Sequence, residues 1–426
     1  GGRRLPPCFL FGAKKLRAFF DLLPFLGDKT GQTKKKFPQV WTFAEKRDRI
    51  RYKLYTIIHF VFYHLGGICM SVPKIRHTME KMAFTPRGQR KSSATCDPVI
   101  RMCWNENQLG MSEKAKAAMA AALEKSNYYP DFYAVALKDR IGEVYGLTRD
   151  NVFTAGGSSA VIDAIGAVYL EEGDEVLYCS PTFGAYWDMA TANGAVPVEV
   201  PLTKEMRYDL DGLYQAITAR TKIIVICNPN NPTGTAVGAD QLAAFVKKVP
   251  EEILIMVDEA YIEYADDPDV HSAVPLILEG YHVLVLKTFS KIHGMAGIRV
   301  GYGLACPEII DDLMRSPGAF NTSTVAIAGA IASLGDRDFL SRSYQMVKDG
   351  RDYLTRELEQ LGCKVYPSQT SFLYFDAHMD PQDLQAECAK RNILIGAFAL
   401  SRVSVGNKAQ NAAFISCLRE ILPAAR

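Results

Sequence analysis

The sequence lacks the cysteine and histidine patterns that mark metal centres and redox pairs. Its 426 residues include 10 cysteines, which are scattered without a C-x-x-C pair and without a His/Cys cluster at metal-ligand spacing. We therefore expect reduced thiols in a cytoplasmic protein, and no bound metal. Internal repeats and low-complexity tracts are also absent, so nothing in the sequence indicates a repeat array.

Apolar runs that could cross a membrane are scarce. One apolar stretch, Leu54 to Met70, follows a basic run and contains two histidines. It is no longer than the roughly 17 residues that a spanning helix needs at minimum, and it lacks an Ala-x-Ala cleavage pattern. A signal peptide or an anchor is therefore a weakly supported alternative, and we expect no membrane partner.

Acidic residues are few near the beginning of the sequence. Residues 1–90 contain 19 Lys or Arg against 5 Asp or Glu, a formal charge of +14, and the remaining residues carry 30 against 42, or −12. Such asymmetry can mark an arm that binds nucleic acid or a membrane. A helix-turn-helix pattern and a long polar linker before Asp97 are both missing, so we expect no nucleic-acid partner. We interpret residues 1–85 as a basic, non-catalytic N-terminal extension, for which disorder and upstream sequence read in frame are two explanations.

From about Asp97 onward, short apolar runs alternate with helical patterns. Hydrophobic residues make up 48% of the sequence, which is enough for a large core and for more than one domain. We predict strands at 175–178, 222–227, 253–257 and 282–287, and helices at 241–248 and 307–314. This alternation favours an α/β fold with a mostly parallel sheet that is covered by helices on both faces.

The last hundred residues have a different pattern. A long helix is predicted at about 337–361, and strands follow near 364–366, 372–375, 393–395 and 402–405. We therefore expect a large domain with an N-terminal arm at 86–320 and a smaller α+β domain at 321–426.

Three motifs occur in order within the expected large domain. They are Asn-Pro-Asn-Asn-Pro-Thr-Gly at 228–234, Asp-Glu-Ala-Tyr at 258–261, and Lys-Thr-Phe-Ser-Lys-Ile-His-Gly-Met-Ala-Gly-Ile-Arg at 287–299. Their order and spacing resemble the core of the class I/II aminotransferases, which are fold-type I pyridoxal-phosphate enzymes, and the histidinol-phosphate aminotransferase branch most closely. The resemblance implies the fold-type I architecture, pyridoxal 5'-phosphate as cofactor and aminotransferase activity.

The chemistry of this cofactor explains the central residues of the motifs. An amine that forms a Schiff base with the cofactor aldehyde has to belong to a lysine, which is the role that the resemblance gives to Lys291. The ring nitrogen stays protonated beside a buried carboxylate, and Asp258 follows an apolar run at an expected strand end. Donors to the phenolate oxygen correspond to Asn231 and Tyr261. Lys291, Asp258 and Tyr261 are the expected catalytic residues.

A phosphate site is expected where a glycine-serine turn follows a strand-like stretch and begins an apolar helix. Backbone N–H groups at a helix start bind anions, which suits Gly157, Ser158 and Ser159. Ser290 and Arg299 correspond to the other phosphate ligands of the family.

Four further residues come from the resemblance. Tyr129 corresponds to the tyrosine that reaches the phosphate of the neighbouring subunit, which implies a homodimer. Phe183 corresponds to the aromatic residue that stacks on the cofactor ring. Arg402 corresponds to the arginine that grips the substrate α-carboxylate as a bidentate fork, and Asn107 is a second expected substrate-binding residue.

Each of these residues also has an ordinary explanation when it is taken alone. A glycine-serine turn is usually only an N-cap, and a lone lysine or arginine is usually a surface charge. Asp258 could cap a turn, and Phe183 could belong to the core. The joint pattern favours function, because the motifs recur in family order with compatible spacing.

The substrate is not identified by the sequence. In the histidinol-phosphate branch, an additional arginine before the carboxylate arginine helps to hold the substrate phosphate, and here Gly396 stands at that place with a short connection to Arg402. A shifted alignment would let Arg391 supply this guanidinium. Phe398 indicates instead a pocket for an uncharged or aromatic side chain.

We expect a two-stage transfer of an amino group from an amino acid, or from histidinol phosphate, to a 2-oxo acid such as 2-oxoglutarate, through an imine at Lys291. A pyridoxal-phosphate-dependent decarboxylase on the same fold is one alternative, and it differs in releasing carbon dioxide. A transcription regulator with an aminotransferase-like sensor is the other, and the basic N-terminal extension is its only support.

Overall fold

The computed structural model describes residues 73–85, 99–318 and 321–422, and the elements below lie in the compact unit Ile75–Arg426. The described part of the expected extension contains a short helix, α3 (His77–Glu80), which lies against α7 (Ala185–Ala192). Leu54 to Met70 and most of that extension lie outside the described residues, so their interpretation stays a prediction. Within the described ranges, none of the helices has the length and apolar character needed to span a membrane.

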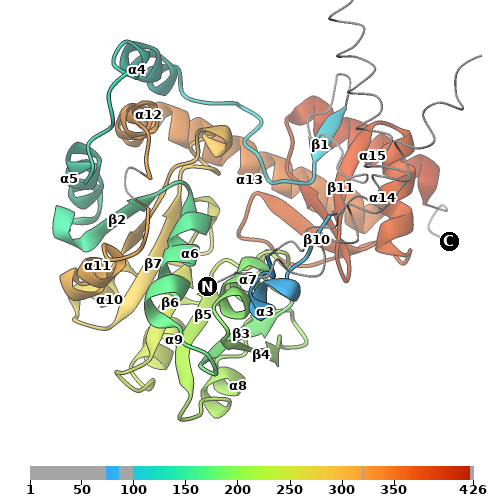
Figure 1. Cartoon of the computed structure of the whole chain (residues 1–426). Helices are drawn as coiled ribbons and strands as arrows, with labels where there is room; N and C mark the ends of the chain where they lie inside the picture. The colour runs from blue at the N-terminus through green and yellow to red at the C-terminus, as the bar shows by residue number, and fades with distance from the viewer. Residues whose placement is uncertain (1–72, 86–98, 319–320, 423–426) are drawn as a thin grey trace, which may run out of the picture. The chain divides into compact units, whose positions relative to one another are not determined.

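A seven-stranded sheet forms the centre of the larger part of the fold (Figure 1). Its strands, in order across the sheet, are β2 (Val152–Ala155), β8 (Gly301–Leu304), β7 (Val283–Thr288), β6 (Leu254–Asp258), β5 (Thr221–Cys227), β3 (Glu175–Ser180) and β4 (Val196–Pro201). Strands β7 to β4 pair in parallel, whereas β8 is antiparallel to both of its neighbours. The predicted mostly parallel sheet and its four predicted strands are confirmed.

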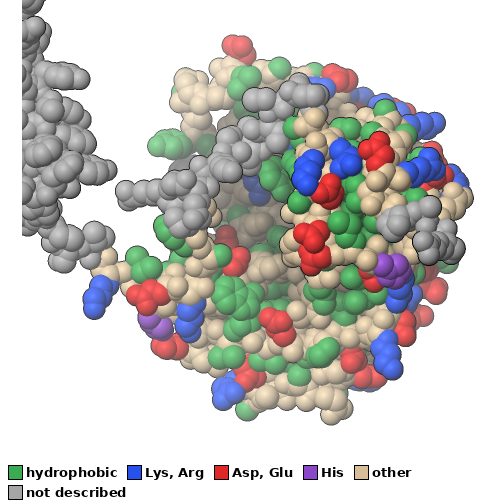
Figure 2. Space-filling view, turned by 90° about the vertical axis from the view of Figure 1, so that its right-hand side faces the viewer, with side chains coloured by type: hydrophobic (Ala, Val, Ile, Leu, Met, Phe, Trp, Pro, Cys, Tyr) green, Lys and Arg blue, Asp and Glu red, His purple; other side chains and the backbone are tan. Residues whose placement is uncertain are grey.

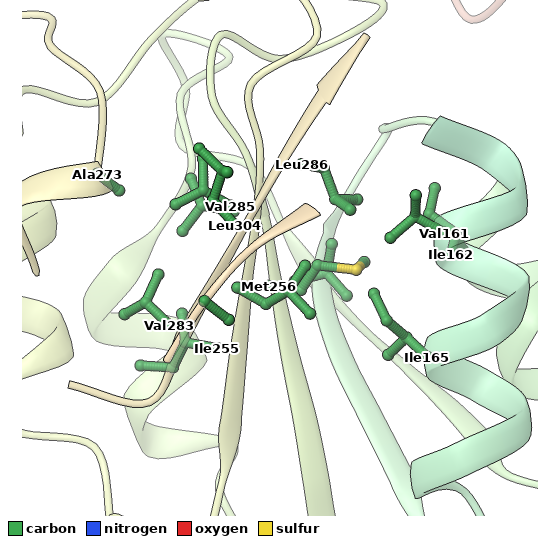
Figure 3. Close-up of a cluster of buried hydrophobic side chains, with 14 of the residues drawn as sticks. Val161, Ile162, Ile165, Ile255, Met256, Ala273, Val283, Val285, Leu286 and Leu304 are labelled. Atoms are coloured by element: carbon green, nitrogen blue, oxygen red, sulfur yellow. The ribbon is translucent and has the colours of Figure 1, made fainter. Parts of the chain in front are cut away.

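The central strands consist of consecutive Val, Ile and Leu residues because both faces of the sheet are covered. Figure 3 shows the alternation along β7, where Val283 and Val285 point to one face and Leu286 points to the other. Leu286 faces Val161 and Ile165 of α6 (Ser158–Tyr169). All of these side chains belong to one buried cluster, which holds the strand ends of the sheet in fixed positions.

Further helices surround the large sheet. They are α5 (Val135–Tyr145), α8 (Leu210–Gln215), α9 (Ala239–Val246), α10 (Val274–Leu278) and α11 (Pro307–Leu313). The predicted helices at 241–248 and 307–314 correspond to α9 and α11, and both are confirmed. Pro307 begins α11, where a missing N–H costs nothing because the first helical N–H groups have no intrahelical partner.

A five-stranded sheet belongs to the C-terminal part of the chain. Its order is β1 (Ile100–Met102), β11 (Ile393–Ala397), β12 (Ser401–Ser404), β10 (Phe372–Asp376) and β9 (Lys364–Val365). The helices α13 (Arg337–Gln360), α14 (Pro381–Lys390) and α15 (Lys408–Ile421) pack with it around a separate core. The predicted long helix and C-terminal strands are confirmed, but β1, which pairs in parallel with β11, comes from the other end of the described chain.

The helix that follows the expected domain boundary at residue 320 belongs to the hydrophobic core of the large sheet. Ala326 and Ala330 of α12 (Thr324–Leu334) are fully buried in the larger core, where α12 lies against α4 (Glu113–Leu123). Packing therefore groups α12 with the large sheet. The division into domains at 86–320 and 321–426 stays a prediction.

Charges of both signs are mixed on the face that Figure 2 presents. Lys and Arg side chains lie among Asp and Glu side chains there, with hydrophobic side chains between them. The described residues of this face therefore form no extended basic patch of the kind that binds nucleic acid.

Candidate active site

A cavity of about 480 Å³ lies at the carboxyl ends of the central strands, beside β12 of the small sheet. This is the edge at which open α/β sheets present their ligand sites, and the volume is ordinary for a small-molecule pocket. The predicted site residues that line it are Ser158, Ser159, Phe183, Asn231, Asp258, Tyr261, Ser290, Lys291, Arg299 and Arg402.

Asp258 is the last residue of β6 and is almost completely buried. Its Oδ2 accepts a 2.8 Å hydrogen bond from the phenol of Tyr186, and its Oδ1 accepts a 3.1 Å bond from the N–H of Ala260. Burial raises the pKa of Asp258, and the Tyr186 hydrogen bond acts against that rise. The carboxylate is thus poised to pair with a cationic group in the cavity.

Lys291 follows the end of β7 and lies next to Tyr261. Its Nζ donates a 3.2 Å hydrogen bond to the carbonyl of Trp104 and lies 5.4 Å from the centre of the Tyr261 ring. The hydroxyl of Tyr261 accepts a 2.9 Å bond from Nδ2 of Asn105. A primary amine and a phenol therefore face the same space, with Asp258 on the neighbouring strand.

Arg299 and the start of α6 form one end of the cavity. Gly157 precedes the helix with φ 99°, and Arg299 has φ 60°, so both residues have left-handed backbones. Nη1 of Arg299 donates to the carbonyl of Ala296 at 3.0 Å and lies 3.4 Å from Oγ of Ser290. A Cβ atom at Gly157 would stand 2.2 Å from Nη2 of Arg299, so only glycine lets the guanidinium lie against the helix start.

Arg402 occupies the opposite side of the cavity. Its guanidinium lies between the rings of Phe372 and Phe398, at 5.2 Å and 4.6 Å from their centres. Nη2 donates to the carbonyl of Cys103 at 2.6 Å, and Nη1 donates to Oδ1 of Asn231. Burial lowers the pKa of Arg402, and its buried Nε has no hydrogen-bond partner among the described residues.

The bond to Arg402 also orients Asn231. Because Oδ1 of Asn231 accepts from the guanidinium, the Nδ2 of the amide remains the group that can donate into the cavity.

A sequence model of the family described as aminotransferase class I and II matches residues 97–418. The chain belongs to this family. A histidinol-phosphate aminotransferase from Moorella thermoacetica is 36% identical over 331 residues, which cover 76% of this chain and 86% of that protein. Another from Brevibacillus brevis is 35% identical over 333 residues, covering 77% and 91%.

Solved structures agree with this assignment. A crystal structure described as a histidinol-phosphate aminotransferase from Erwinia carotovora atroseptica matches this chain with a TM-score of 0.73 and 31% sequence identity. The match covers 76% of this chain and 96% of that one. The pyridoxal-5'-phosphate complex of histidinol-phosphate aminotransferase from Sinorhizobium meliloti shares the fold, with a TM-score of 0.75, 23% identity and coverage of 83% and 98%. The predicted fold-type I architecture, the cofactor pyridoxal phosphate and the aminotransferase class are confirmed. The enzyme acts on small-molecule amino and 2-oxo acids.

The cavity of this aminotransferase fits its cofactor at both ends of the ring. The end of the cavity at Arg299 and the start of α6 suits a phosphate, because N–H groups of a helix start and a guanidinium converge there. The buried carboxylate of Asp258 suits a protonated ring nitrogen, because an opposing cation offsets the cost of burying its charge.

Three predicted site residues of the aminotransferase lie outside the lining of the cavity. Gly157 is adjacent to it, as its contact with Arg299 shows. The amide of Asn107 donates instead to the carbonyl of Ile292 at 2.8 Å and to Oγ of Ser343 at 2.9 Å. Asn105, two residues earlier, lines the cavity in its place. Tyr129 is 83% exposed and does not line the cavity.

Sequence reasoning did not find Trp104, Asn105 and Tyr186, which all contact the site. Tyr186 lies three residues after Phe183, a spacing that places both on one side of a helical turn, and their rings meet edge to face at 5.8 Å. The three-residue spacing from Phe183 could therefore have indicated that Tyr186 lies at the site. Trp104 and Asn105 come from the segment after β1, whose position depends on a long-range strand pairing.

Proposed function

We propose that this aminotransferase works through Lys291, with Asp258, Asn231 and Tyr261 around the cofactor ring and Arg402 at the substrate carboxylate. One observation carries the proposal. An amine at the end of β7 and a buried carboxylate at the end of β6 line a single cavity, with Arg299 at one side and Arg402 at the other.

The residues have distinct roles in this proposal. Ser158, Ser159, Ser290 and Arg299 hold the cofactor phosphate, Gly157 permits their approach, and Phe183 stacks on the ring. When bound, pyridoxal phosphate supplies an aldehyde for the lysine amine and an electron sink for the substrate. The carboxylate of Asp258 keeps the ring nitrogen positive, and Asn231 and Tyr261 donate to the phenolate oxygen.

Lys291 then moves the proton at the substrate Cα. Its Nζ lies within the cavity and would act on this proton as general base and then as general acid. Arg402 binds the carboxylate as a fork and so fixes which face of Cα is presented to Lys291. The product is a 2-oxo acid, and a second 2-oxo acid such as 2-oxoglutarate takes up the amino group. The names of the relatives indicate histidinol phosphate as a donor. It has a phosphate ester in place of the carboxylate, so it would present that phosphate to Arg402 and leave as a 2-oxo phosphate ester.

The enzyme is further proposed to be a cytoplasmic homodimer. Tyr128, Tyr129 and Tyr133 are 72%, 83% and 56% exposed in the connection between α4 and α5, which is unusual for large aromatic residues and typical of an interface. Tyr129 would contact the phosphate in the neighbouring subunit. The free thiols among the described cysteines support a reducing compartment. Residues 1–85 are proposed to take no part in catalysis.

Replacement of Lys291 tests the proposal. The Lys291→Ala variant, purified and supplied with pyridoxal phosphate, should lose both turnover and the absorbance band of the lysine-bound cofactor. The exposed Lys247, which pairs with Glu279, provides the control variant Lys247→Ala and should leave both unchanged. Retained turnover in Lys291→Ala would refute the proposal, and release of carbon dioxide in place of a 2-oxo acid would favour the decarboxylase.

A further inference from the structure

We propose that Lys287 is a positioning residue for cofactor binding, whose ammonium group balances the charge of Glu259 and so lets the neighbouring Asp258 meet the cofactor as a charged carboxylate. The inference rests on the proposed function, in which Asp258 pairs with the ring nitrogen of the cofactor. It follows from a cluster of buried charges that lies outside the lining of the cavity.

Two acidic residues stand next to each other at the end of β6. Asp258 is 4% exposed and lines the cavity, whereas Glu259 is 1% exposed and does not line it. The N–H of Glu259 still donates to the carbonyl of Leu286 in β7, at 3.0 Å, so the chain stays extended and the two acidic side chains point to opposite sides. Burial is the largest cause of the raised pKa of Asp258, and the charge of Glu259 adds to that rise.

Lys287 of β7 supplies the balancing charge. Its Nζ lies 2.9 Å from Oε2 of Glu259 and 3.1 Å from Oε1 of Glu263, and its side chain is 3% exposed. Among the described residues, Lys287 is the only cation within ion-pair distance of Glu259. Burial acts to lower the pKa of Lys287, but the two carboxylates raise it well above its ordinary value, so the ammonium group stays charged.

The two partners of Lys287 differ in their access to water. The side chain of Glu263 is 30% exposed, so water can solvate its charge, whereas the carboxylate of Glu259 is enclosed. Glu259 also accepts hydrogen bonds from the hydroxyl of Ser272 at 2.6 Å and from the N–H of Ala273 at 2.5 Å. These donors hold the carboxylate in place but bring no net charge. Without Lys287, an unpaired buried charge would therefore remain directly beside Asp258.

The same ion pairs also connect the segments that carry the site residues. Lys287 lies four residues before Lys291 on one segment, and Glu263 lies two residues after Tyr261 on the other. A purely mechanical connection between these segments is therefore the alternative role of Lys287. The experiment has to separate this connection from the balance of charge.

Cofactor binding by the full-length protein tests the inference. Titration of the cofactor-free protein with pyridoxal phosphate, followed at the absorbance band of the lysine-bound cofactor, gives the Kd, and urea unfolding gives the stability of the same preparations. Lys287→Met keeps a long apolar side chain and removes the charge. Because a protonated Asp258 no longer pairs as an anion with the ring nitrogen, we expect the Kd to increase by at least about tenfold.

A charge-neutral double variant separates charge from connection. When Lys287→Met is combined with Glu259→Gln, the ion pair is lost completely, but no unpaired charge remains beside Asp258. We expect the Kd of the double variant to stay within about threefold of the wild-type value, although its connection between the segments is missing. Glu259→Gln alone removes the repelling charge, so its Kd should also stay within about threefold of wild type or fall below it.

Arg220→Met is the matched control. Arg220 is the ion-pair partner of Glu175, a buried carboxylate at the first residue of β3 and thus at the amino end of the sheet, away from the cavity. Its replacement also leaves a buried carboxylate without its cation. This variant should lose stability, as Lys287→Met does, while its Kd stays within about twofold of the wild-type value.

The outcomes distinguish the inference from the proposed function. An increase in Kd of less than about tenfold in Lys287→Met overturns the inference, and so does an increase of more than about threefold in Glu259→Gln or in the double variant. Each of these results leaves the role of Lys291 intact. If Lys287→Met does not fold, the other two variants decide by the same limits. If the wild-type protein forms no band of lysine-bound cofactor, the proposed function fails and the inference fails with it.

Discussion

The phenol of Tyr186 donates a 2.8 Å hydrogen bond to the carboxylate of Asp258, and both groups are buried. Tyr186 lies on α7 and Asp258 ends β6, so the bond joins a helix to the strand that presents the carboxylate. The bond lowers the pKa of Asp258 against the larger effect of burial. Tyr186 therefore opposes the rise in the pKa of Asp258, the carboxylate that we propose pairs with the cofactor nitrogen.

Removing this hydroxyl should weaken the binding of pyridoxal phosphate. In Tyr186→Phe, the pKa of Asp258 rises further and its pairing with the ring nitrogen loses strength, so we expect the cofactor Kd to increase about 10- to 100-fold. Spectroscopic titration of the cofactor-free protein measures this. Tyr178→Phe is a matched control, since Tyr178 is a buried tyrosine whose hydroxyl meets Glu199 at 3.4 Å. Equal Kd values in both variants would contradict the role of Tyr186.

Gly157 offers a second test of the cofactor site. In Gly157→Ala, the new methyl group would stand 2.2 Å from the present position of Nη2 of Arg299, so the guanidinium has to move away from the helix start. A side chain at φ 99° also adds strain, and cofactor affinity should fall at least about tenfold. Gly173→Ala carries similar strain, at φ 94°, but its new methyl group meets nothing within 4 Å. That control should lose about 1 kcal/mol of stability and bind the cofactor normally. Normal binding by Gly157→Ala would show that the contact does not matter.

The sequence could predict those parts of the fold that depend on local patterns. Continuous Val, Ile and Leu runs in β5, β6 and β7 indicate strands buried on both faces, and parallel strands bring their carboxyl ends to one edge. The motifs that follow these strands therefore had to meet. For that reason Asp258 and Lys291 were expected together, and the cavity contains both.

Contacts across long sequence distances could not be predicted in this way. Asn105 reaches Tyr261 because β1 pairs with β11, nearly three hundred residues later, and no periodicity encodes that register. Asn107 was predicted to bind the substrate, whereas Asn105, two residues earlier, lines the cavity. Residues two apart point to the same side only within a strand, and β1 ends at Met102, before both of them. Tyr186 was overlooked because a tyrosine that hydrogen-bonds to a site residue and a tyrosine that only packs in the core look alike in sequence.

Arg402 should be sensitive to replacement even by lysine. Lysine keeps the charge but cannot supply the planar fork, so Arg402→Lys should lower kcat/KM for the amino donor by about 100-fold while the cofactor Kd changes little. Half-reactions and cofactor titration measure the two effects separately. Arg356→Lys, at an arginine that is 60% exposed, should change neither. A parallel loss of cofactor affinity in Arg402→Lys would indicate that the guanidinium supports the cofactor site rather than the substrate.

His293 should make stability depend on pH. It is buried beneath the active-site segment, with Nδ1 2.7 Å from Oγ of Ser333, and burial lowers its pKa from 6.5 to about 4. Between these values the unfolded chain binds a proton that the folded chain does not, so the free energy of unfolding falls as the pH falls. The slope is about 1.4 kcal/mol per pH unit, and the total loss is about 3 kcal/mol by pH 4.

Urea unfolding between pH 7 and pH 4 tests the contribution of His293. His293→Asn keeps a polar group near Ser333 but cannot become protonated, so its stability should decline less steeply over this range than that of the wild type, by about 3 kcal/mol in total. His271→Asn is the control, because His271 is exposed and its replacement should leave the wild-type slope unchanged. Parallel curves for wild type and His293→Asn would mean that the imidazole is solvated well enough to take its proton in the folded protein, and that the acid sensitivity comes from the carboxylates.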